Sequence, residues 1–234
     1  MSTLLYRYMP VHRLWQMLAT KKIYFLRNTM WDDPFEAFLA KRYCISKSRD
    51  FNLLNSDKYF LCCTTKRERD HFWRNYTPNK NGVMITLDIA SLKGIRDGII
   101  AEKMTYPVRN EIRRILEKIA RGTLTKAELT DLFFIKRKAF EDEAEYRLMI
   151  QGKSYKRDMV GVDFSPEKTI TRILFDPRMD SRTFESHKLF INEQFGPFNV
   201  RHSKLYSPDE AFPIKKRPTM RATLAQSPRR AARR

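Results

Sequence analysis

The sequence is poor in the residue types that build many phosphate, metal and catalytic sites. Its seven glycines are scattered singly, so no glycine-rich loop is present to hold a nucleotide phosphate, and ATP-driven chemistry of the usual kind is disfavoured. Its four histidines lack the spacing of metal ligands, which leaves little support for a zinc site or a catalytic triad. They are His12, His71, His187 and His202.

Cysteine is also scarce, and long apolar runs are missing. The three cysteines form no CxxC pair, and adjacent Cys62 and Cys63 lie in an apolar run, so we expect them to be buried, reduced packing residues. No N-terminal run is apolar enough for a signal peptide, and no stretch approaches the length of a membrane span. We therefore expect a cytoplasmic protein with no membrane among its partners.

Negative charge is under-represented. The chain has 27 Asp and Glu against 46 Lys and Arg, a formal net charge of +19. Eight of the basic residues and no carboxylate lie between Phe212 and Arg234, which leaves +11 of the +19 in the rest of the chain. A field of this sign favours polyanions, so nucleic acid or a nucleotide is the expected partner. The alternative is a generic basic surface kept for solubility.

The hydrophobic content of 42% is sufficient for a core, and the length of 234 residues predicts one domain. We expect it to cover residues 1–207, followed by a basic, disordered tail at 208–234. Strands and helices mix without regular alternation, which predicts an α+β fold with a single mixed, mostly antiparallel sheet and flanking helices. Strand patterns occur at Thr3–Met9, Lys22–Leu26, Tyr59–Thr65, Val83–Asp88, Tyr146–Ile150, Val160–Phe164, Ile170–Phe175 and Asn199–His202.

Helix signals occur between these strands. Apolar spacing predicts helices after Val11, over His71–Tyr76 and over Arg182–Glu193. An apolar stripe that begins at Val108 predicts another helix, which Gly122 ends. Thr125 and Glu128 have capping-box spacing, so a further helix is expected to run to about Ala139. Asp33-Pro34 marks a turn, and Asp32 or Asp33 could cap a short helix through Phe38.

Seven short segments stand in a recognisable order. They are LYRY (Leu5–Tyr8), DDPFE (Asp32–Glu36), FLCCTT (Phe60–Thr65), HFWRNY (His71–Tyr76), GVMITLD (Gly82–Asp88), FEDEAEYR (Phe140–Arg147) and VDFSPEKTITRILF (Val162–Phe175). Together they resemble a bacterial family, domain of unknown function 2971, over roughly residues 4–203. Where that family has Asn, Ser, Met-Trp and Trp, this chain has Asp32, Thr64 or Thr65, Phe72-Trp73 and Phe140.

A second, looser resemblance concerns activity. ADP-ribosyltransferases of the type that uses Arg, Ser or Thr, and Glu-x-Glu carry these residues in that order, and this chain has Arg7, Thr64-Thr65 and Glu143-Ala-Glu145. The resemblance implies an ADP-ribosyltransferase-like fold, NAD as substrate, and a nucleic acid or protein as acceptor. In bacteria such an activity would suit a toxin or a phage-defence protein.

The chemistry assigns each residue a role. Cleavage of the nicotinamide–ribose bond builds positive charge on the ribose, and a nearby carboxylate stabilises it; Glu145 is the candidate. Glu143 would orient or deprotonate the acceptor, and both would face one cleft if both lay on a strand. Arg7 would hold the dinucleotide phosphates, and a hydroxyl of Thr64 or Thr65 would support Glu145 and the nucleotide.

Structural interpretations compete with these roles. Glu145 and Arg147 could pair with neighbouring charges at a sheet edge, and Thr64 and Thr65 could be ordinary strand residues. Arg7 could stack on an aromatic ring or pair with Asp33 or Glu36. The aromatic residues Tyr6, Tyr8, Phe72, Trp73 and Tyr76 are expected in the core more than around nicotinamide, although one of them could face the cleft.

Two other functions remain open. One is a non-catalytic module that binds nucleic acid through its basic surface. The other is a metal-dependent nuclease, because Asp32, Asp33 and Glu36 could join Glu143 and Glu145 around Mg²⁺. Helix capping by one Asp, with Glu36 near the helix start, is the favoured interpretation of that segment, so no metal is expected.

Overall fold

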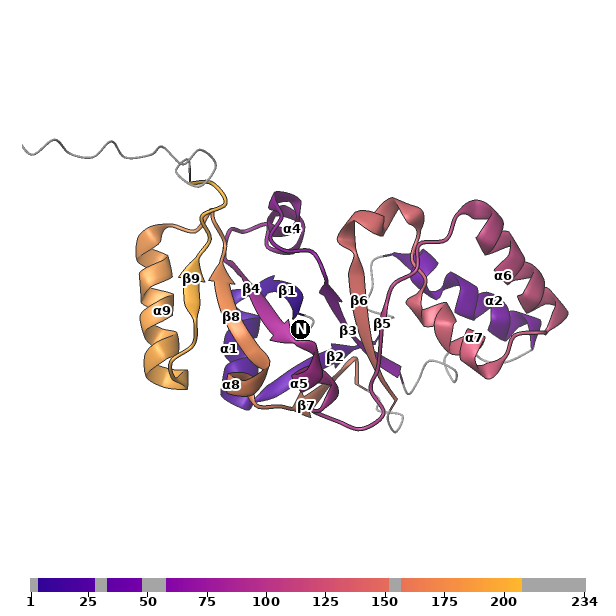
Figure 1. Ribbon diagram of the computed structural model, residues 1–234, viewed down its shortest axis with the longest axis horizontal. Coiled ribbons are helices and arrows are strands. Elements are labelled where there is room, and N and C mark those ends of the chain that lie inside the picture. Colours follow the sequence, from indigo (N-terminus) through magenta and orange to yellow (C-terminus); the bar gives the residue numbers. More distant parts are fainter. Residues whose placement is uncertain (1–3, 28–32, 48–57, 152–156, 208–234) are drawn as a thin grey trace, which may run out of the picture.

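A computed structural model describes residues 4–27, 33–47, 58–151 and 157–207, and in these ranges nine strands form one sheet (Figure 1). The strands are β1 Leu4–Pro10, β2 Lys22–Leu26, β3 Lys58–Thr64, β4 Gly82–Asp88, β5 Ile100–Lys103, β6 Glu145–Gln151, β7 Met159–Asp163, β8 Ile170–Phe175 and β9 Val200–His202. The helices are α1 Val11–Thr20, α2 Phe38–Ser46, α4 Asp70–Tyr76, α5 Ile89–Lys93, α6 Arg109–Arg121, α7 Lys126–Asp131, α8 Pro166–Thr169 and α9 Ser181–Phe195. Three 3-10 helices accompany them: η2 Pro34–Ala37, η3 Leu132–Phe134 and η4 Lys138–Glu143.

The sheet is mixed and mostly antiparallel, as predicted. Its main path runs β5-β6-β3-β1-β4-β8-β9, and β2 joins β3 to β7. Of these pairs, β8 and β9 are parallel. All eight predicted strands are present, and the α+β prediction is confirmed. A ninth strand, β5, was not predicted from the sequence: it is a four-residue edge strand in which a single residue, Ala101, is buried.

The sheet opens between β1 and β3. β1 pairs with β4 along its whole length, from Leu4 to Pro10. It meets β3 at a single pair, Tyr6 opposite Thr64, while β3 pairs with β6 over seven residues. Away from the pair of Tyr6 and Thr64, β1 and β3 therefore form no continuous ladder, and their side chains border a space.

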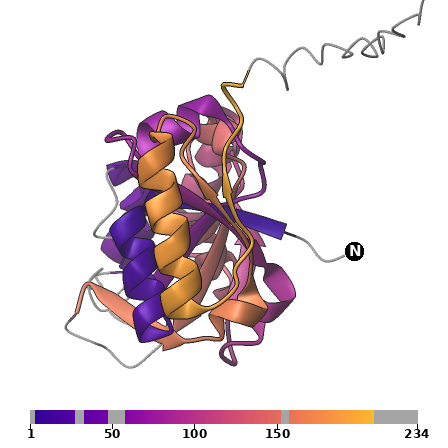
Figure 2. The same ribbon diagram turned by 90° about the vertical axis from the view of Figure 1, so that its left-hand side faces the viewer.

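Helix α1 packs against β1, β2 and β4, and other helices pack at the two ends of the sheet. Figures 1 and 2 show α1 and α9 side by side, and the rings of Trp15 and His187 on these helices lie 5.2 Å apart. At the other end, α2, α6 and α7 group beyond β5 and β6 (Figure 1). They share a separate apolar cluster of Leu39, Tyr43, Cys44, Ile119, Leu132 and Ile135.

Two helix predictions are confirmed in their capping chemistry. Gly122 ends α6 in the left-handed conformation, with φ of 67°. The Thr125 hydroxyl accepts from the Glu128 N–H at 3.2 Å, while the Glu128 carboxylate accepts from the Thr125 N–H at 2.9 Å. Val108, expected in the apolar stripe of α6, is instead exposed at the N-cap.

Two helix boundaries differ from the prediction. The helix that begins after Thr125 ends at Asp131 instead of Ala139, and η3 and η4 follow it. Leu132 and the next two residues are all buried, and three adjacent side chains cannot share one narrow face of an α-helix. The short helix expected through Phe38 continues as α2 to Ser46, because its side chains are buried at helical spacing.

The DDPFE turn has the predicted cap. The Asp33 carboxylate accepts from the Phe35 N–H at 3.0 Å and begins η2. Asp32 lies outside the described residues, as does the predicted tail at 208–234. Within the ranges that the structure describes, no helix combines the length and the apolar composition needed to cross a bilayer.

Candidate active site

A cavity of about 640 Å³ lies where the sheet opens between β1 and β3. Residues of β1, β3, β6, α4, η2 and η4 line it, together with the segment between η3 and η4. Four of the five residues singled out from the sequence line this cleft: Arg7, Thr64, Glu143 and Glu145. Thr65 lies outside its lining. Arg7 and Glu145, which are 138 positions apart in the chain, therefore border one space.

Three carboxylates in the cleft wall converge on one ammonium group. The Lys136 Nζ lies 2.6 Å from Glu143 Oε2, 3.1 Å from Glu145 Oε2 and 3.4 Å from Glu36 Oε1. Arg147 contacts two of the same carboxylates: its Nη2 lies 2.7 Å from Glu145 Oε1 and 2.5 Å from Glu36 Oε2. The five side chains form one ionic cluster, called the carboxylate cluster below, with three negative and two positive charges.

Burial and charge set the protonation of the carboxylate cluster. Burial alone would raise the pKa of Glu145, but Arg147 and Lys136 lower it below its ordinary value, so the carboxylate is ionised. Burial alone would lower the pKa of Lys136, but Glu145, Glu36 and Glu143 raise it. Cys62, Glu145 and Glu36 raise the pKa of Arg147 against the effect of burial. All three groups therefore carry their full charge at neutral pH.

Glu143 and Glu145 reach the cleft by a route that the sequence analysis described wrongly. Glu145 is the first residue of β6, but Glu143 ends η4 and is not on a strand. Between them Ala144 is left-handed, with φ of 41°, and turns the chain by its backbone. This turn, and not strand alternation, brings both side chains into one cavity. β6 is also not an edge strand, since β5 covers it.

The two threonines hold this turn through its backbone. The Thr64 hydroxyl donates to the Glu143 carbonyl at 2.6 Å, and the Thr65 hydroxyl donates to the Ala144 carbonyl at 3.1 Å. The predicted hydroxyl contact to the Glu145 carboxylate is absent from both residues. Instead, Glu145 donates its N–H to the Tyr106 hydroxyl at 2.8 Å. The threonines therefore position the glutamates and leave the carboxylates for the cleft.

Arg7 brings a positive charge to the cleft without a matching carboxylate. Its guanidinium donates to the Cys62 carbonyl. No carboxylate of the described residues is within ion-pair distance of it, because Asp33 pairs with Arg137 at 3.1 Å and Glu36 belongs to the carboxylate cluster. The predicted alternatives for Arg7, an ion pair with Asp33 or Glu36, are therefore wrong.

Cysteine and aromatic side chains complete the wall. Cys63 is buried, but Cys62 is half-buried beside Glu145, and burial and that charge raise the pKa of the Cys62 thiol. Tyr8 stacks against Tyr76 with ring centroids 6.2 Å apart. Burial and the Glu143 charge raise the pKa of Tyr76, so its hydroxyl stays protonated close to the carboxylates. Tyr76 was expected in the core, yet it is 44% exposed and lines the cleft.

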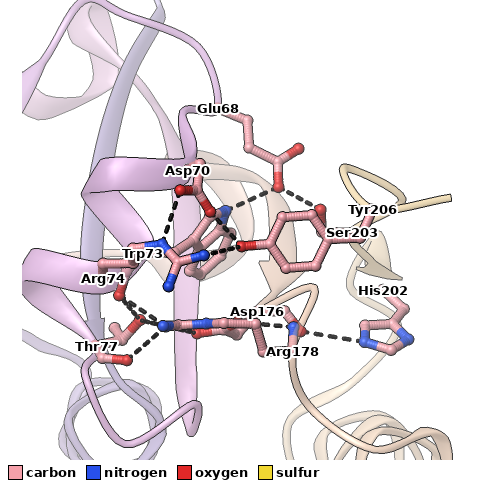
Figure 3. Close-up of polar contacts among 10 residues, drawn as sticks. All are labelled: Glu68, Asp70, Trp73, Arg74, Thr77, Asp176, Arg178, His202, Ser203 and Tyr206. Atoms are coloured by element: carbon pink, nitrogen blue, oxygen red, sulfur yellow. Dashed lines mark hydrogen bonds and ion pairs between the residues drawn. The ribbon is translucent and has the colours of Figure 1, made fainter. Parts of the chain in front are cut away.

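A second polar network fixes α4, which carries Tyr76 (Figure 3). Arg178 donates to the carbonyls of Trp73 at 2.8 Å and Thr77 at 2.7 Å, so it caps the end of the helix. Its charge is balanced by Asp176 at 2.6 Å, a fully buried carboxylate. At the helix start, Glu68 accepts from the Trp73 indole at 2.8 Å. These contacts therefore hold α4, and with it Tyr76, in position at the cleft.

The carboxylates are not arranged as metal ligands. Among the described residues, no group of three or more His, Cys, Asp or Glu could hold a metal ion. The point on which Glu36, Glu143 and Glu145 converge is occupied by an ammonium group. The arrangement predicted for a nuclease is thus a set of ion pairs.

The sequence analysis missed Lys136 as a member of the site. Lys136 was assigned to a helix interior, and no motif surrounds it. Arg147 was noticed as a neighbour of Glu145, but its contact with Glu36 crosses 111 residues.

Three comparisons relate this chain to known proteins. The family "Protein of unknown function (DUF2971)" matches residues 72–148, a segment that includes Tyr76, Lys136, Glu143 and Glu145, and this match confirms the family resemblance there. No curated protein sequence matches the chain.

Two solved structures are similar over most of the chain. DarT of Thermus sp. 2.9 in complex with NAD⁺ has 11% identity and a TM-score of 0.42, and covers 87% of this chain and 96% of its own. The same protein in complex with ADP-ribosylated ssDNA has 11% identity and a TM-score of 0.43, and covers 87% and 95%.

Proposed function

We propose that this protein is an enzyme that cleaves the nicotinamide–ribose bond of NAD and transfers ADP-ribose to an acceptor. The observation that carries the proposal is the meeting of Arg7, which has no carboxylate partner among the described residues, with Glu143 and Glu145 in one cavity of about 640 Å³. A cavity of this volume is in the range that encloses small-molecule ligands.

The charges in the cleft match the charges of NAD and of its cleavage. The guanidinium of Arg7 suits the pyrophosphate, because a planar fork of donors binds phosphate oxygens well. In the same cleft, the carboxylate cluster has a net charge of −1. A negative site in a partly desolvated cleft stabilises an oxocarbenium-like ribose more than the neutral ground state, and that difference accelerates the reaction.

Each residue has a distinct part in the proposed reaction. Glu145 stabilises the ribose as the bond to nicotinamide breaks and the bonding electrons leave with that ring. Glu143 orients the acceptor and takes its proton as the new bond to the ribose carbon forms. Tyr76 offers an exposed aromatic face at the cleft for a planar ring. NAD is consumed as a substrate, and the scheme needs no metal.

A basic rim supports nucleic acid as the acceptor. Lys66, Arg67 and Arg69 are exposed on the loop that follows Thr64. The neighbouring carboxylates have other partners: Glu68 binds Trp73 and Ser203, and Asp70 binds Arg74 and Tyr206 (Figure 3). The loop therefore carries three exposed cations close in sequence to Thr64, which lines the cleft, and this suits a phosphodiester backbone. A protein acceptor is the alternative, and a role as a bacterial toxin or phage-defence protein belongs to the same proposal.

The test measures nicotinamide release. Purified protein is incubated with NAD and with single-stranded DNA, RNA or a protein lysate, beside Glu145→Gln and the control Glu141→Gln. Glu141 is exposed and pairs with Lys138 on the same 3-10 helix. We expect release by wild type and by the control, and a loss of about 100- to 1,000-fold in Glu145→Gln. Absence of release by the folded wild type with every acceptor would overturn the proposal.

One observation favours a second function, a non-catalytic nucleic-acid-binding module. Both carboxylate oxygens of Glu145 are engaged, by Lys136 and Arg147, as in a structural ion-pair network. Under this alternative, the protein binds oligonucleotides with a strong salt dependence and does not consume NAD. The Glu145→Gln variant then binds oligonucleotides with the affinity of wild type.

A further inference from the structure

We propose that Lys136 is a positioning residue that holds the carboxylates of Glu143 and Glu145 side by side in the cleft. The inference rests on the proposed function, since it assigns the element that organises the two acidic groups. The Lys136 ammonium lies 2.6 Å from Glu143 Oε2 and 3.1 Å from Glu145 Oε2. No other cation of the described residues contacts both glutamates.

The backbone fixes Lys136 for this role. Its N–H donates to the Thr105 carbonyl at 3.0 Å, and the preceding residue, Ile135, forms a β-bridge with Thr105. The side chain is 10% exposed, and its ammonium lies 5.0 Å from the centre of the Phe140 ring. The backbone of Lys136 is thus fixed by hydrogen bonds, and burial restricts the conformations of its long side chain.

Lys136 and Arg147 have different parts in the cluster. Arg147 contacts Glu145 Oε1 and Glu36, and it also donates to the Phe133 carbonyl at 2.8 Å, so it joins η2, η3 and β6. Lys136 contacts the other oxygen of Glu145 and is the link to Glu143. Arg147 therefore anchors one carboxylate, whereas Lys136 sets the relation between two.

Two neighbouring carboxylates in a desolvated cleft repel each other, and the usual relief is protonation of one or movement apart. An ammonium between the two carboxylates offsets their repulsion, so both stay ionised and close together. Without Lys136 the cluster would have a charge of −2 instead of −1. The inference therefore predicts a change in the pH range of activity, which a loss of packing alone would not produce.

The pH dependence involves the charged and titratable groups of the cluster and of the cavity around it. They are Glu36 on η2, Glu143 on η4, Glu145 and Arg147 on β6, Cys62 and Cys63 on β3, Tyr6, Arg7 and Tyr8 on β1, Tyr76 on α4, and Asp33, Arg137 and Tyr106. Loss of the ammonium raises the pKa of Glu145, because Lys136 is one of the two cations that lower it. Activity that requires the ionised carboxylate then disappears at a higher pH on acidification.

The experiment measures nicotinamide release by wild type and four variants between about pH 4.5 and about pH 9. Circular dichroism first confirms that each variant is folded. Lys136→Met should lower kcat by about 100-fold or more and shift the acidic limb upward by about one pH unit. The control Lys138→Met, at an exposed residue that pairs with Glu141, should stay within about twofold of wild type. Lys136→Met with Glu36→Gln restores the net charge and should return the acidic limb toward its wild-type position.

The outcomes separate the two proposals. An inactive wild type overturns the proposed function. An active wild type whose acidic limb is unchanged in Lys136→Met, or is not restored by Glu36→Gln, overturns the role of Lys136 and leaves the function standing. Lys136→Arg covers the case in which Lys136→Met does not fold: it keeps the charge, so an unchanged acidic limb with reduced kcat is expected. A shifted limb in Lys136→Arg overturns the inference.

Discussion

The Thr64 hydroxyl donates a hydrogen bond of 2.6 Å to the Glu143 carbonyl, across 79 residues of sequence. The same oxygen accepts from the Lys66 N–H at 3.0 Å. One buried hydroxyl thus connects the end of β3, the start of the basic loop and the turn that carries both glutamates. The position of the acidic pair depends on this contact.

Thr64→Val should therefore weaken both folding and activity. The substitution keeps the shape but leaves a partly buried carbonyl without its donor, which costs about 1 kcal/mol of unfolding free energy. Urea denaturation and nicotinamide release measure the two effects. Thr64→Ser keeps the hydroxyl and should retain most activity; equal losses in both variants would contradict the role given to the hydrogen bond.

Arg7→Met should weaken NAD binding and change the chemical step little. The guanidinium has no carboxylate partner among the described residues, so its removal costs the contact with phosphate and breaks no ion pair. A charged hydrogen bond of about 1.5 to 3 kcal/mol corresponds to a rise in Kd of roughly 10- to 150-fold. Calorimetric titration with NAD, in a Glu145→Gln background that prevents turnover, measures it. Arg13→Met, on the exposed face of α1, is the matched control; equal affinities in both would contradict the prediction.

Arg178→Met should destabilise the protein by about 3 to 5 kcal/mol, because it leaves the fully buried Asp176 carboxylate without its cation. It also removes the donor from the carbonyls that end α4. Arg74→Met breaks an exposed pair with Asp70 and should cost less than about 1 kcal/mol. Guanidinium denaturation compares the two variants (both sites appear in Figure 3); similar losses would show that burial does not decide the effect.

Acidification should unfold the protein partly through Glu145. Its folded pKa is lowered from the ordinary 4.5, so its ionised form contributes stability above about pH 4.5 that is lost as the pH falls toward the lower folded pKa. Urea denaturation between about pH 7 and pH 3 should show a smaller loss of stability in Glu145→Gln than in wild type. Parallel curves for the two proteins would remove Glu145 from the account of acid sensitivity.

The basic rim should contribute to nucleic-acid binding through phosphate contacts. Replacement of Lys66, Arg67 and Arg69 by Ser should reduce the slope of log K against log salt for single-stranded DNA by about 2, since each contact contributes roughly 0.7. Filter binding or fluorescence anisotropy across a salt series measures the slope. The control replaces three exposed arginines of α6 by Ser: Arg109, Arg113 and Arg121. A similar reduction of the slope in this control would contradict a specific role of the basic rim.

Local sequence patterns predicted most of the elements, because they depend on neighbouring residues. The short run Lys22–Leu26 marks β2, and Thr125 with Glu128 marks the start of α7. The failures have local causes as well. Buried residues 132–134 continue a helical composition but form a 3-10 helix instead of an α-helix, and Ala144 adopts a left-handed conformation that an alanine does not predict.

The sequence by itself determined the order of strands and helices, the basic charge, and the candidates Arg7, Glu143 and Glu145. The tertiary structure alone decided their partners. Lys136 contacts Glu36 across 100 residues because η2 and the segment before η4 both border the opening between β1 and β3. Ion pairing depends on distance through space, and local periodicity contains no information about it. Whether a carboxylate is a surface charge or part of a buried cluster is therefore settled only when the sheet has formed.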